Sequence, residues 1–190
     1  GEGRVPAREV GPEEIRRFIG SGVHELVTRC LKTVDPARVE QGVTLFRAYY
    51  TAHLVDHSQL YPGSREVLEY FKTRRQAVIT NKPTPYAREI LRALGVVGYF
   101  CEIVGGDSAY PKKPHPGALL GVMRSEGVSA EDTVFVGDSP IDVETGRQAG
   151  VFSVSVSHGF SDEPELRVAA PEAMVDDFHD LLRLAKAQRW

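Results

Sequence analysis

The stretch 134–142, Val-Phe-Val-Gly-Asp-Ser-Pro-Ile-Asp, constrains the fold more than any other part of the 190-residue sequence. A short apolar run that ends in glycine and an acid is typical of a buried parallel strand that stops at a loop. Pro140 and the acids around it fit the first turn of a following helix. Because open α/β sheets bind ligands at the carboxyl ends of their strands, Asp138 and Asp142 are expected at a binding edge.

Two carboxylates at that edge suit Mg²⁺, a hard cation that takes oxygen ligands and keeps several of its waters. A second interpretation stays open from these residues alone. Asp138 can be a helix cap, and Asp142 can be a solvated acid that the helix dipole favours in the first turn.

The rest of the chain predicts an α/β fold with a helical opening. Residues 1–59 contain helical patterns without a defensible strand, and from residue 60 short strands alternate with amphipathic helices. We therefore predict a helical domain over 1–59 and an α/β domain with a parallel sheet over 60–190. The expected strands are 77–80, 102–104, 133–137, 151–156 and 173–175. Serines alternate with apolar residues in 151–156, so we expect one face of that strand to be less buried.

Net charge, hydropathy and cysteine spacing indicate which partners and which cell compartment to expect. The net charge of −3 gives no reason to expect nucleic acid or an anionic membrane surface as a partner. The apolar runs are too short for a membrane span, and the first residues do not resemble a signal peptide. Cys30 and Cys101 lie far apart without metal-type spacing, which indicates reduced thiols and a cytoplasmic protein.

Two further strand ends carry polar groups that suit an anion. Thr80 and Asn81 follow the run Ala77-Val78-Ile79, where a hydroxyl and main-chain N–H groups can hold a phosphate oxygen. Alternatively, Thr80 only caps the turn before a proline. Lys113 precedes Pro114 and can place a point charge beside a phosphoryl group, or it can be a solvated lysine near a helix start.

Taken in order, these segments resemble the haloacid dehalogenase-like hydrolase superfamily, and within it the phosphoglycolate phosphatases. The matching segments are Val-Ile-Thr-Asn-Lys at 78–82, Gly-Gly-Asp at 105–107, Lys-Pro-His-Pro at 113–116 and the stretch 134–142. The helical opening resembles the small helical cap of that family. The resemblance implies a Rossmann-like core with a parallel sheet and an all-helical cap.

The resemblance also implies roles for individual residues. Thr80 would hold the phosphoryl oxygen with Asn81 beside it, and Lys113 would offset charge on the nucleophile and the transferring group. Asp138 would be a Mg²⁺ ligand. Asp142 would be a second ligand, or an acid that reaches the metal through water or the lysine. Phosphoryl transfer mainly needs positioning and charge neutralisation, which these groups supply together.

The first motif of the family, a strand that ends in D-x-D-G-T, does not occur in the sequence. By resemblance this strand is central, between the strands that end at Thr80 and Asp138, so we expect an interrupted sheet with unpaired backbone groups at that place. Three explanations stay open. The native protein is longer, the slot is filled by another chain or by residues 1–10, or the chain is a degenerate non-enzyme.

We therefore expect an enzyme that hydrolyses small phosphate monoesters with Mg²⁺ through a phospho-aspartyl intermediate, whose nucleophile lies outside these 190 residues. The 190 residues alone should then be inactive or nearly so. Two alternatives are a sugar phosphomutase-type phosphotransferase of the same superfamily and an inactive phosphate-binding or partner-docking relative. The expected partner is a small phosphorylated metabolite.

Overall fold

The computed structural model describes residues 10–16, 18, 22–159 and 161–190. It divides the chain into two compact units, Gly1–His53 and Leu54–Trp190. Residues 1–9, which one of the alternatives above threads back into the sheet, lie outside the described residues.

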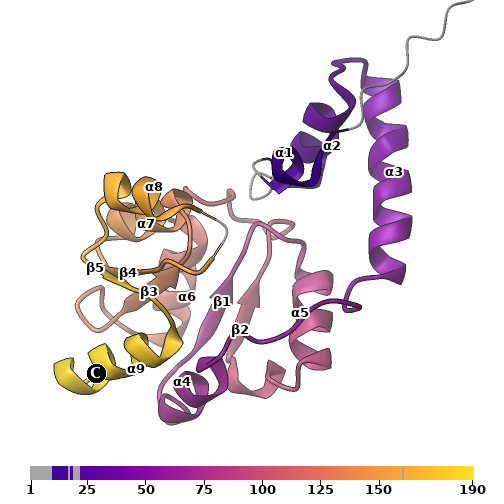
Figure 1. Cartoon of the computed structure of the whole chain (residues 1–190). Coiled ribbons are helices and arrows are strands. Elements are labelled where there is room, and N and C mark those ends of the chain that lie inside the picture. Colours follow the sequence, from indigo (N-terminus) through magenta and orange to yellow (C-terminus); the bar gives the residue numbers. More distant parts are fainter. Residues whose placement is uncertain (1–9, 17, 19–21, 160) are drawn as a thin grey trace, which may run out of the picture. The chain divides into compact units, whose positions relative to one another are not determined.

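In the described part of the first unit, the secondary structure is helical. Its helices are α1 (Pro12–Arg16), α2 (Val23–Leu31) and α3 (Pro36–Ala52) (Figure 1). The carboxylate of Asp35 caps α3 by accepting a hydrogen bond from the main-chain N–H of Ala37 at 3.1 Å. Helices α2 and α3 bury a small apolar cluster of Val27, Val39 and Val43 between them.

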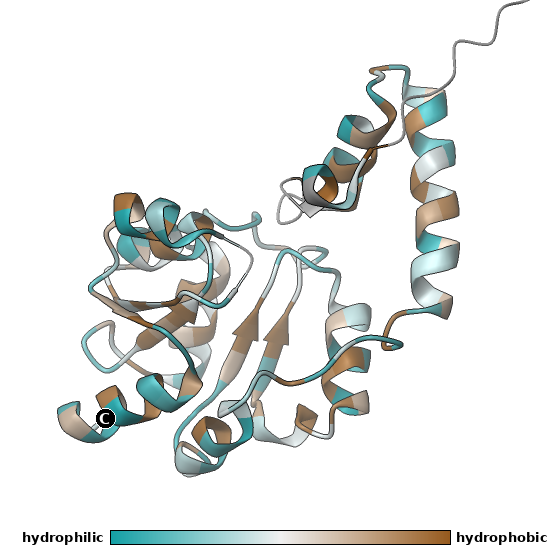
Figure 2. Cartoon of the chain, viewed as in Figure 1, coloured by the Kyte–Doolittle hydropathy of each residue, from teal (hydrophilic) through white to brown (hydrophobic). Residues whose placement is uncertain are grey.

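The described residues of the second unit form five strands, each within one residue of its predicted position. They are β1 (Ala77–Ile79), β2 (Glu102–Val104), β3 (Val134–Gly137), β4 (Phe152–Val156) and β5 (Ala173–Val175) (Figure 1). The pairs β1–β2, β3–β4 and β4–β5 are all parallel, as predicted. Figure 2 shows that the strands are the most hydrophobic elements of this unit, whereas the helices carry polar faces.

Within the described residues the strands form two separate sheets, in the orders β1-β2 and β3-β4-β5. Strands β1 and β3 belong to different sheets, and the place between them is where the family resemblance implies an interruption. Burial follows the pairing. No residue of β1 is fully buried, and Val136 in β3 is 37% exposed, whereas four of the five residues of β4 are buried. That a strand with D-x-D-G-T belongs at the interruption stays a prediction.

Helices cover the strands of the second unit. They are α4 (Ser64–Tyr70), α5 (Thr84–Ala93), α6 (Gly117–Glu126), α7 (Pro140–Ala149), α8 (Glu163–Ala169) and α9 (Phe178–Gln188), with a short 3₁₀ turn, η1, at Val97–Tyr99. Helix α7 contacts β3 and β4, α5 contacts β2, and α9 contacts β5 and α4. Val67 of α4, Val154 of β4 and Leu181 of α9 form one apolar cluster.

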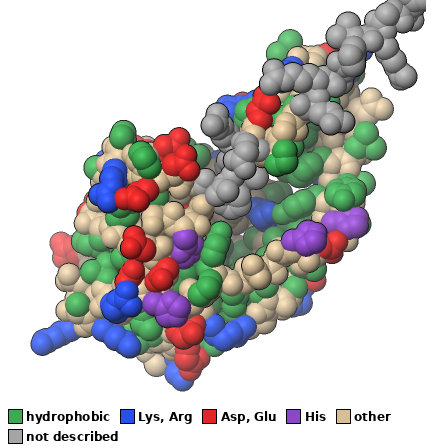
Figure 3. Space-filling model, in the orientation of Figure 1, with side chains coloured by type: hydrophobic (Ala, Val, Ile, Leu, Met, Phe, Trp, Pro, Cys, Tyr) green, Lys and Arg blue, Asp and Glu red, His purple; other side chains and the backbone are tan. Residues whose placement is uncertain are grey.

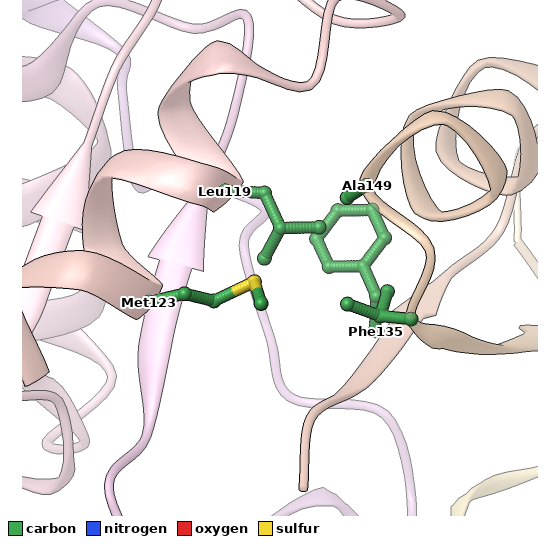
Figure 4. Packing of buried hydrophobic residues seen from close by; sticks show 5 residues of the cluster. Leu119, Met123, Phe135 and Ala149 are labelled. Carbon is green, nitrogen blue, oxygen red and sulfur yellow. The ribbon is translucent and has the colours of Figure 1, made fainter. Parts of the chain in front are cut away.

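Helix α6 links the two sheets through apolar contacts. Its Leu119 and Met123 point toward Phe135 of β3 and Ala149 of α7, as Figure 4 shows. Ile79 of β1 packs against the same cluster. Helix α6 therefore contributes apolar side chains that pack against strands of both sheets.

The expectation of a less buried face on β4 is wrong. Ser153 and Ser155 are only 2% and 1% exposed, because α7 covers the face on which they lie. A carboxylate oxygen of Glu172 accepts hydrogen bonds from the main-chain N–H and the hydroxyl of Ser153. The serines are thus buried polar groups of the core, a pattern that alternation in the sequence does not reveal.

Charges of both signs lie on the visible face of the second unit (Figure 3). On the face in Figure 3, acidic and basic side chains of the second unit are interspersed with hydrophobic ones. Among the helices of the described residues, none combines the length and the hydropathy that a bilayer crossing needs.

Candidate active site

The candidate site lies at the carboxyl ends of β1 and β3, with one loop between β2 and α6. Thr80 and Asn81 directly follow β1, and Asp138 directly follows β3. Asp142 lies in the first turn of α7, and Lys113 lies in the β2–α6 loop. All five residues predicted from the sequence therefore belong to the second unit.

An ion pair joins the two halves of the site. The ammonium Nζ of Lys113 donates to Oδ1 of Asp142 at 2.6 Å, and the two side chains are only 15% and 8% exposed. The ammonium also lies 5.8 Å from the ring centroid of Phe135 in β3. Both charged groups are nearly buried, so water and salt screen the attraction between them only weakly. This attraction helps to keep the two side chains in place.

The second oxygen of Asp142 organises the loop that carries Asp138. Oδ2 accepts from the main-chain N–H of Asp138 at 3.2 Å and from the hydroxyl of Ser139 at 2.6 Å. Both oxygens of Asp142 thus accept hydrogen bonds from protein donors. This arrangement favours the predicted role in which Asp142 reaches a metal indirectly, through water or the lysine.

The amide of Asn81 reaches across to the main chain of Lys113. Its Nδ2 donates to the carbonyl oxygen of Lys113 at 3.1 Å, and its Oδ1 accepts from the main-chain N–H of Lys113 at 2.9 Å. Asn81, Lys113, Asp142 and Asp138 consequently form one hydrogen-bonded series from the end of β1 to the end of β3.

The turn after β1 is held by its own hydrogen bonds. Oγ1 of Thr80 accepts from the main-chain N–H of Lys82 at 3.1 Å, which is the turn-capping interpretation of that residue. A hydroxyl that accepts one hydrogen bond can still donate its proton to another group. Capping the turn and holding a phosphoryl oxygen are therefore compatible roles for Thr80.

An aspartate in the neighbouring loop supports this turn. Oδ1 of Asp107 accepts from the main-chain N–H and from the hydroxyl of Thr84, both at 2.7 Å. These bonds, the main-chain one first, lower the pKa of Asp107 below its ordinary value. The hydroxyl of Thr84 in turn accepts from the main-chain N–H of Gly105 at 3.0 Å.

Two glycines let the backbone approach the acids of the site. A Cβ on Gly159, in the β4–α8 loop, would lie well inside van der Waals contact with Cβ and Oδ2 of Asp138. A Cβ on Gly137 would clash in the same way with the side chain of Asp142. Asp138 is therefore confined by a loop about twenty residues further along the chain.

The acids of the site fit Mg²⁺ by the chemistry of their donors. Within the described residues no group of three or more His, Cys, Asp and Glu side chains gathers into a closed metal cage. Mg²⁺ does not require one, since it is usually held by one or two carboxylates together with waters and substrate phosphates. Asp138, with Asp142 behind it, is a donor set of this kind.

Comparison with known proteins identifies the family. The model of the haloacid dehalogenase-like hydrolase family matches residues 4–156, which is most of the chain. This chain belongs to that family. As a haloacid dehalogenase-like hydrolase it has the α/β fold with parallel strands that its sequence predicts.

Several relatives of this haloacid dehalogenase-like hydrolase carry one name. The phosphoglycolate phosphatase of Pseudomonas putida is 36% identical over 189 residues, which cover 95% of this chain and 68% of that protein. That of Pectobacterium atrosepticum is 34% identical over 180 residues, covering 92% of this chain and 77% of that protein. The chain thus spans about two thirds to three quarters of the length of these relatives.

Solved structures resemble the chain closely in fold. The crystal structure of a predicted phosphoglycolate phosphatase from Haemophilus somnus superposes with a TM-score of 0.85 at 29% identity, covering 93% of this chain and 83% of that one. A second, described as a putative phosphoglycolate phosphatase from Lactobacillus delbrueckii, has a TM-score of 0.82 at 25% identity, covering 91% and 82%.

Some features of the site were not predicted from the sequence of this haloacid dehalogenase-like hydrolase. They are the hold of Asn81 on Lys113, the contact of Gly159 with Asp138, and the bonds of Asp107 and Ser139. Each joins loops or main-chain groups that no spacing rule connects. Asn81, Asp107 and Ser139 stood within matched segments, but the matches did not show what these side chains contact, and Gly159 lies outside all of these segments.

Proposed function

We propose that this chain carries the core site of a Mg²⁺-dependent phosphatase that hydrolyses small phosphate monoesters, with 2-phosphoglycolate as the first candidate substrate. The observation that carries the proposal is the series from Asn81 through Lys113 to Asp142, which ends on the loop of Asp138. It unites a lysine and two acids from distant parts of the chain. The name shared by the relatives supports the choice of substrate.

In this proposal the residues divide the work of binding and charge neutralisation. The hydroxyl of Thr80 donates to a phosphoryl oxygen, Asn81 helps to shape the phosphate site, and the ammonium of Lys113 offsets negative charge on the phosphoryl group. Asp138 holds Mg²⁺, and Asp142 positions the lysine and the loop of Asp138 through its hydrogen bonds. The metal, when bound, supplies further positive charge to the phosphoryl oxygens.

The nucleophile is proposed to be an aspartate outside residues 1–190, because the printed sequence has no D-x-D-G-T segment. Its carboxylate would attack phosphorus while the bond to the leaving alcohol breaks, and the alcohol would take up a proton from the second aspartate of the same D-x-D-G-T segment. Water would then cleave the phospho-aspartyl group and release phosphate. The interruption between β1 and β3 supports this proposal, because it leaves an edge of each sheet without a strand partner among the described residues.

The setting follows from the same proposal. A helical cap over 1–59 would select the substrate and exclude water, and the α/β core over 60–190 would carry the chemistry. The partner would be a small phosphorylated metabolite in the cytoplasm.

Phosphate release tests the function directly. We expect little release from 2-phosphoglycolate by the 190-residue chain, and Mg²⁺-dependent turnover by a chain extended at its N-terminus with an apolar strand that ends in D-x-D-G-T. Asp138→Asn in the extended chain should lower kcat by a factor of about 10² or more. Arg124→Gln, an exposed substitution on α6, serves as the matched control.

Three results would contradict the proposal. Robust turnover by the 190-residue chain, abolished by Asp138→Asn, would place the nucleophile within the chain. Isomerised sugar phosphate in place of free phosphate would identify a phosphotransferase. A well-folded extended chain that binds phosphate without any turnover would identify a binding protein.

A further inference from the structure

We infer that Asn81 is a positioning residue, which sets the place of the Lys113 ammonium by holding the main chain of Lys113 at both its N–H and its carbonyl group. The role of Asn81 in phosphate chemistry rests on the proposed function. The contact between Asn81 and the main chain of Lys113 is independent of that proposal.

The geometry of the pair is that of a local clamp. One side-chain amide satisfies both main-chain groups of a residue 32 positions away, with distances of 2.9 and 3.1 Å. Lys113 lies in a segment without helix or strand, so its main chain has no ladder of its own to fix it. The amide takes the place that a neighbouring strand would have.

A lysine gains from such a clamp because its side chain is long and flexible. The ammonium sits on a four-carbon stem, whose many rotamers spread the charge over a wide volume. Here the stem is held at both ends, by Asn81 at the backbone and by Asp142 at the ammonium, 2.6 Å away. The two contacts together restrict where the ammonium can lie.

Asn81 can act as a clamp because hydrogen bonds and backbone contacts hold its own turn in place. The hydroxyl of Thr80 closes the turn on Lys82, and Thr84 is tied to Asp107. A Cβ on Gly106 would clash with the main-chain carbonyl of Asn81, so the two loops lie in direct backbone contact. Asn81 therefore presents its amide from a fixed base.

Reductive methylation with formaldehyde measures the hold without reference to catalysis. In the 190-residue chain, the labelling rate of Lys113 is compared with that of its exposed neighbour Lys112 by peptide mass spectrometry. Asn81→Leu keeps the branching of the side chain and removes both hydrogen bonds. We expect the Lys113/Lys112 ratio to rise about fivefold to tenfold, the size of effect that lost hydrogen bonds produce.

Gln76→Met is the matched control. The amide of Gln76 also donates to a main-chain carbonyl, that of Leu68 at 3.1 Å, within the same unit. This substitution should leave the Lys113/Lys112 ratio unchanged. An equal rise in both variants would show general loosening of the fold and would overturn the inference.

Coupling to Asp142 gives a second test. In an Asp142→Asn chain the ammonium has already lost its charged partner, so adding Asn81→Leu should change the ratio by less than about twofold. Full additivity would contradict the inference. If Asn81→Leu does not fold by circular dichroism, Asn81→Ser replaces it, and an unchanged ratio in that folded variant overturns the inference equally.

The kinetic readout separates positioning from direct phosphate contact. In the extended chain, positioning predicts that Asn81→Leu lowers kcat by a factor of about 10 to 100 while KM for 2-phosphoglycolate stays within about twofold. A raised KM with an unchanged labelling ratio would make Asn81 a phosphate ligand only. Absence of turnover in every form would count against the proposed function, while the labelling ratio would still decide the role of Asn81.

Discussion

Asp142 shows how one buried carboxylate can organise a site. It is 6% exposed, and its two oxygens accept from Lys113, Ser139 and the main chain of Asp138. In the sequence the same residue fits a metal ligand or a first-turn acid of α7 equally well. The contacts explain why both interpretations arise, because the acid stands at the helix N-terminus and also faces the site.

Gly159 gives a prediction at the scale of a single residue. Gly159→Ala should push the carboxylate of Asp138 out of place, because the added methyl group would overlap its Cβ and Oδ2. We expect Mg²⁺ to bind at least about tenfold more weakly, since coordination geometry for this ion is strict. Isothermal titration of the chain with MgCl₂ measures the change.

Gly98→Ala is the control for this substitution. A Cβ on Gly98 would have no heavy atom within 4 Å, and its φ lies outside the left-handed region. Equal Mg²⁺ affinity in the Gly159→Ala and Gly98→Ala chains would show that the contact with Asp138 does not matter.

At the scale of elements, the sequence predicts most of the second unit. The five strands could be predicted because each is a short apolar run that is followed by, or ends in, a glycine or a polar residue. Helix α8 was not predicted, although Pro164 and two acids in its first turn are ordinary helix-start signals. With only seven residues, its apolar periodicity is too short to recognise.

Contacts between elements could not be predicted in the same way. Asn81 is predicted to bind phosphate because it follows a strand, and this stays a prediction. Its hydrogen bonds to the main chain of Lys113, 32 residues away, could not be predicted, because a main chain has no side-chain signature. The serines of β4 looked exposed because serine is usually a surface residue, whereas helix α7 covers them. Long-range packing decides both cases.

Strand β4 offers a paired prediction about stability. Ser153→Ala removes a hydroxyl that donates to Glu172 and should lower the free energy of unfolding by about 2 kcal/mol, the usual value for a bond to a charged group. Ser155→Ala removes a hydroxyl that is buried without a hydrogen-bond partner, and should be neutral or stabilising by up to about 1 kcal/mol. Urea unfolding at pH 7 compares the two, and a larger loss in Ser155→Ala would contradict the described contacts.

The two hydrogen bonds between Asp107 in the β2–α6 loop and Thr84 at the start of α5 predict that the stability of the fold depends on pH. Since its pKa is lowered in the folded state, Asp107 stabilises the fold above its unfolded pKa of about 4, and this contribution disappears as the pH falls through the lower folded value. Asp107→Asn should therefore be less stable than the parent at pH 7 and approach it below about pH 4. Urea midpoints across this range measure the difference, and a constant gap would contradict the assignment.

At the scale of the whole second unit, two sheets are joined by two different means. Helix α6 supplies apolar contacts to Ile79 and Phe135, and the series from Asn81 to Asp142 supplies polar ones at the carboxyl ends. The candidate site therefore lies where the sheets meet. A site at this junction can form only if both sheets keep their places, so binding and the stability of the unit are expected to be linked.

One measurement tests most directly whether a cation and an anion share this site. In ¹H–¹⁵N NMR spectra of the chain, Mn²⁺ used in place of Mg²⁺ should broaden the amide signals of Asp138 and Ser139. In the Mg²⁺-loaded chain, added inorganic phosphate should shift the amide signals of Thr80, Asn81 and Lys113, and Asp138→Asn should abolish the Mn²⁺ broadening and weaken this shift. Broadening that is scattered over other surface acids, or that survives Asp138→Asn, would contradict a single phosphate and metal site at this junction.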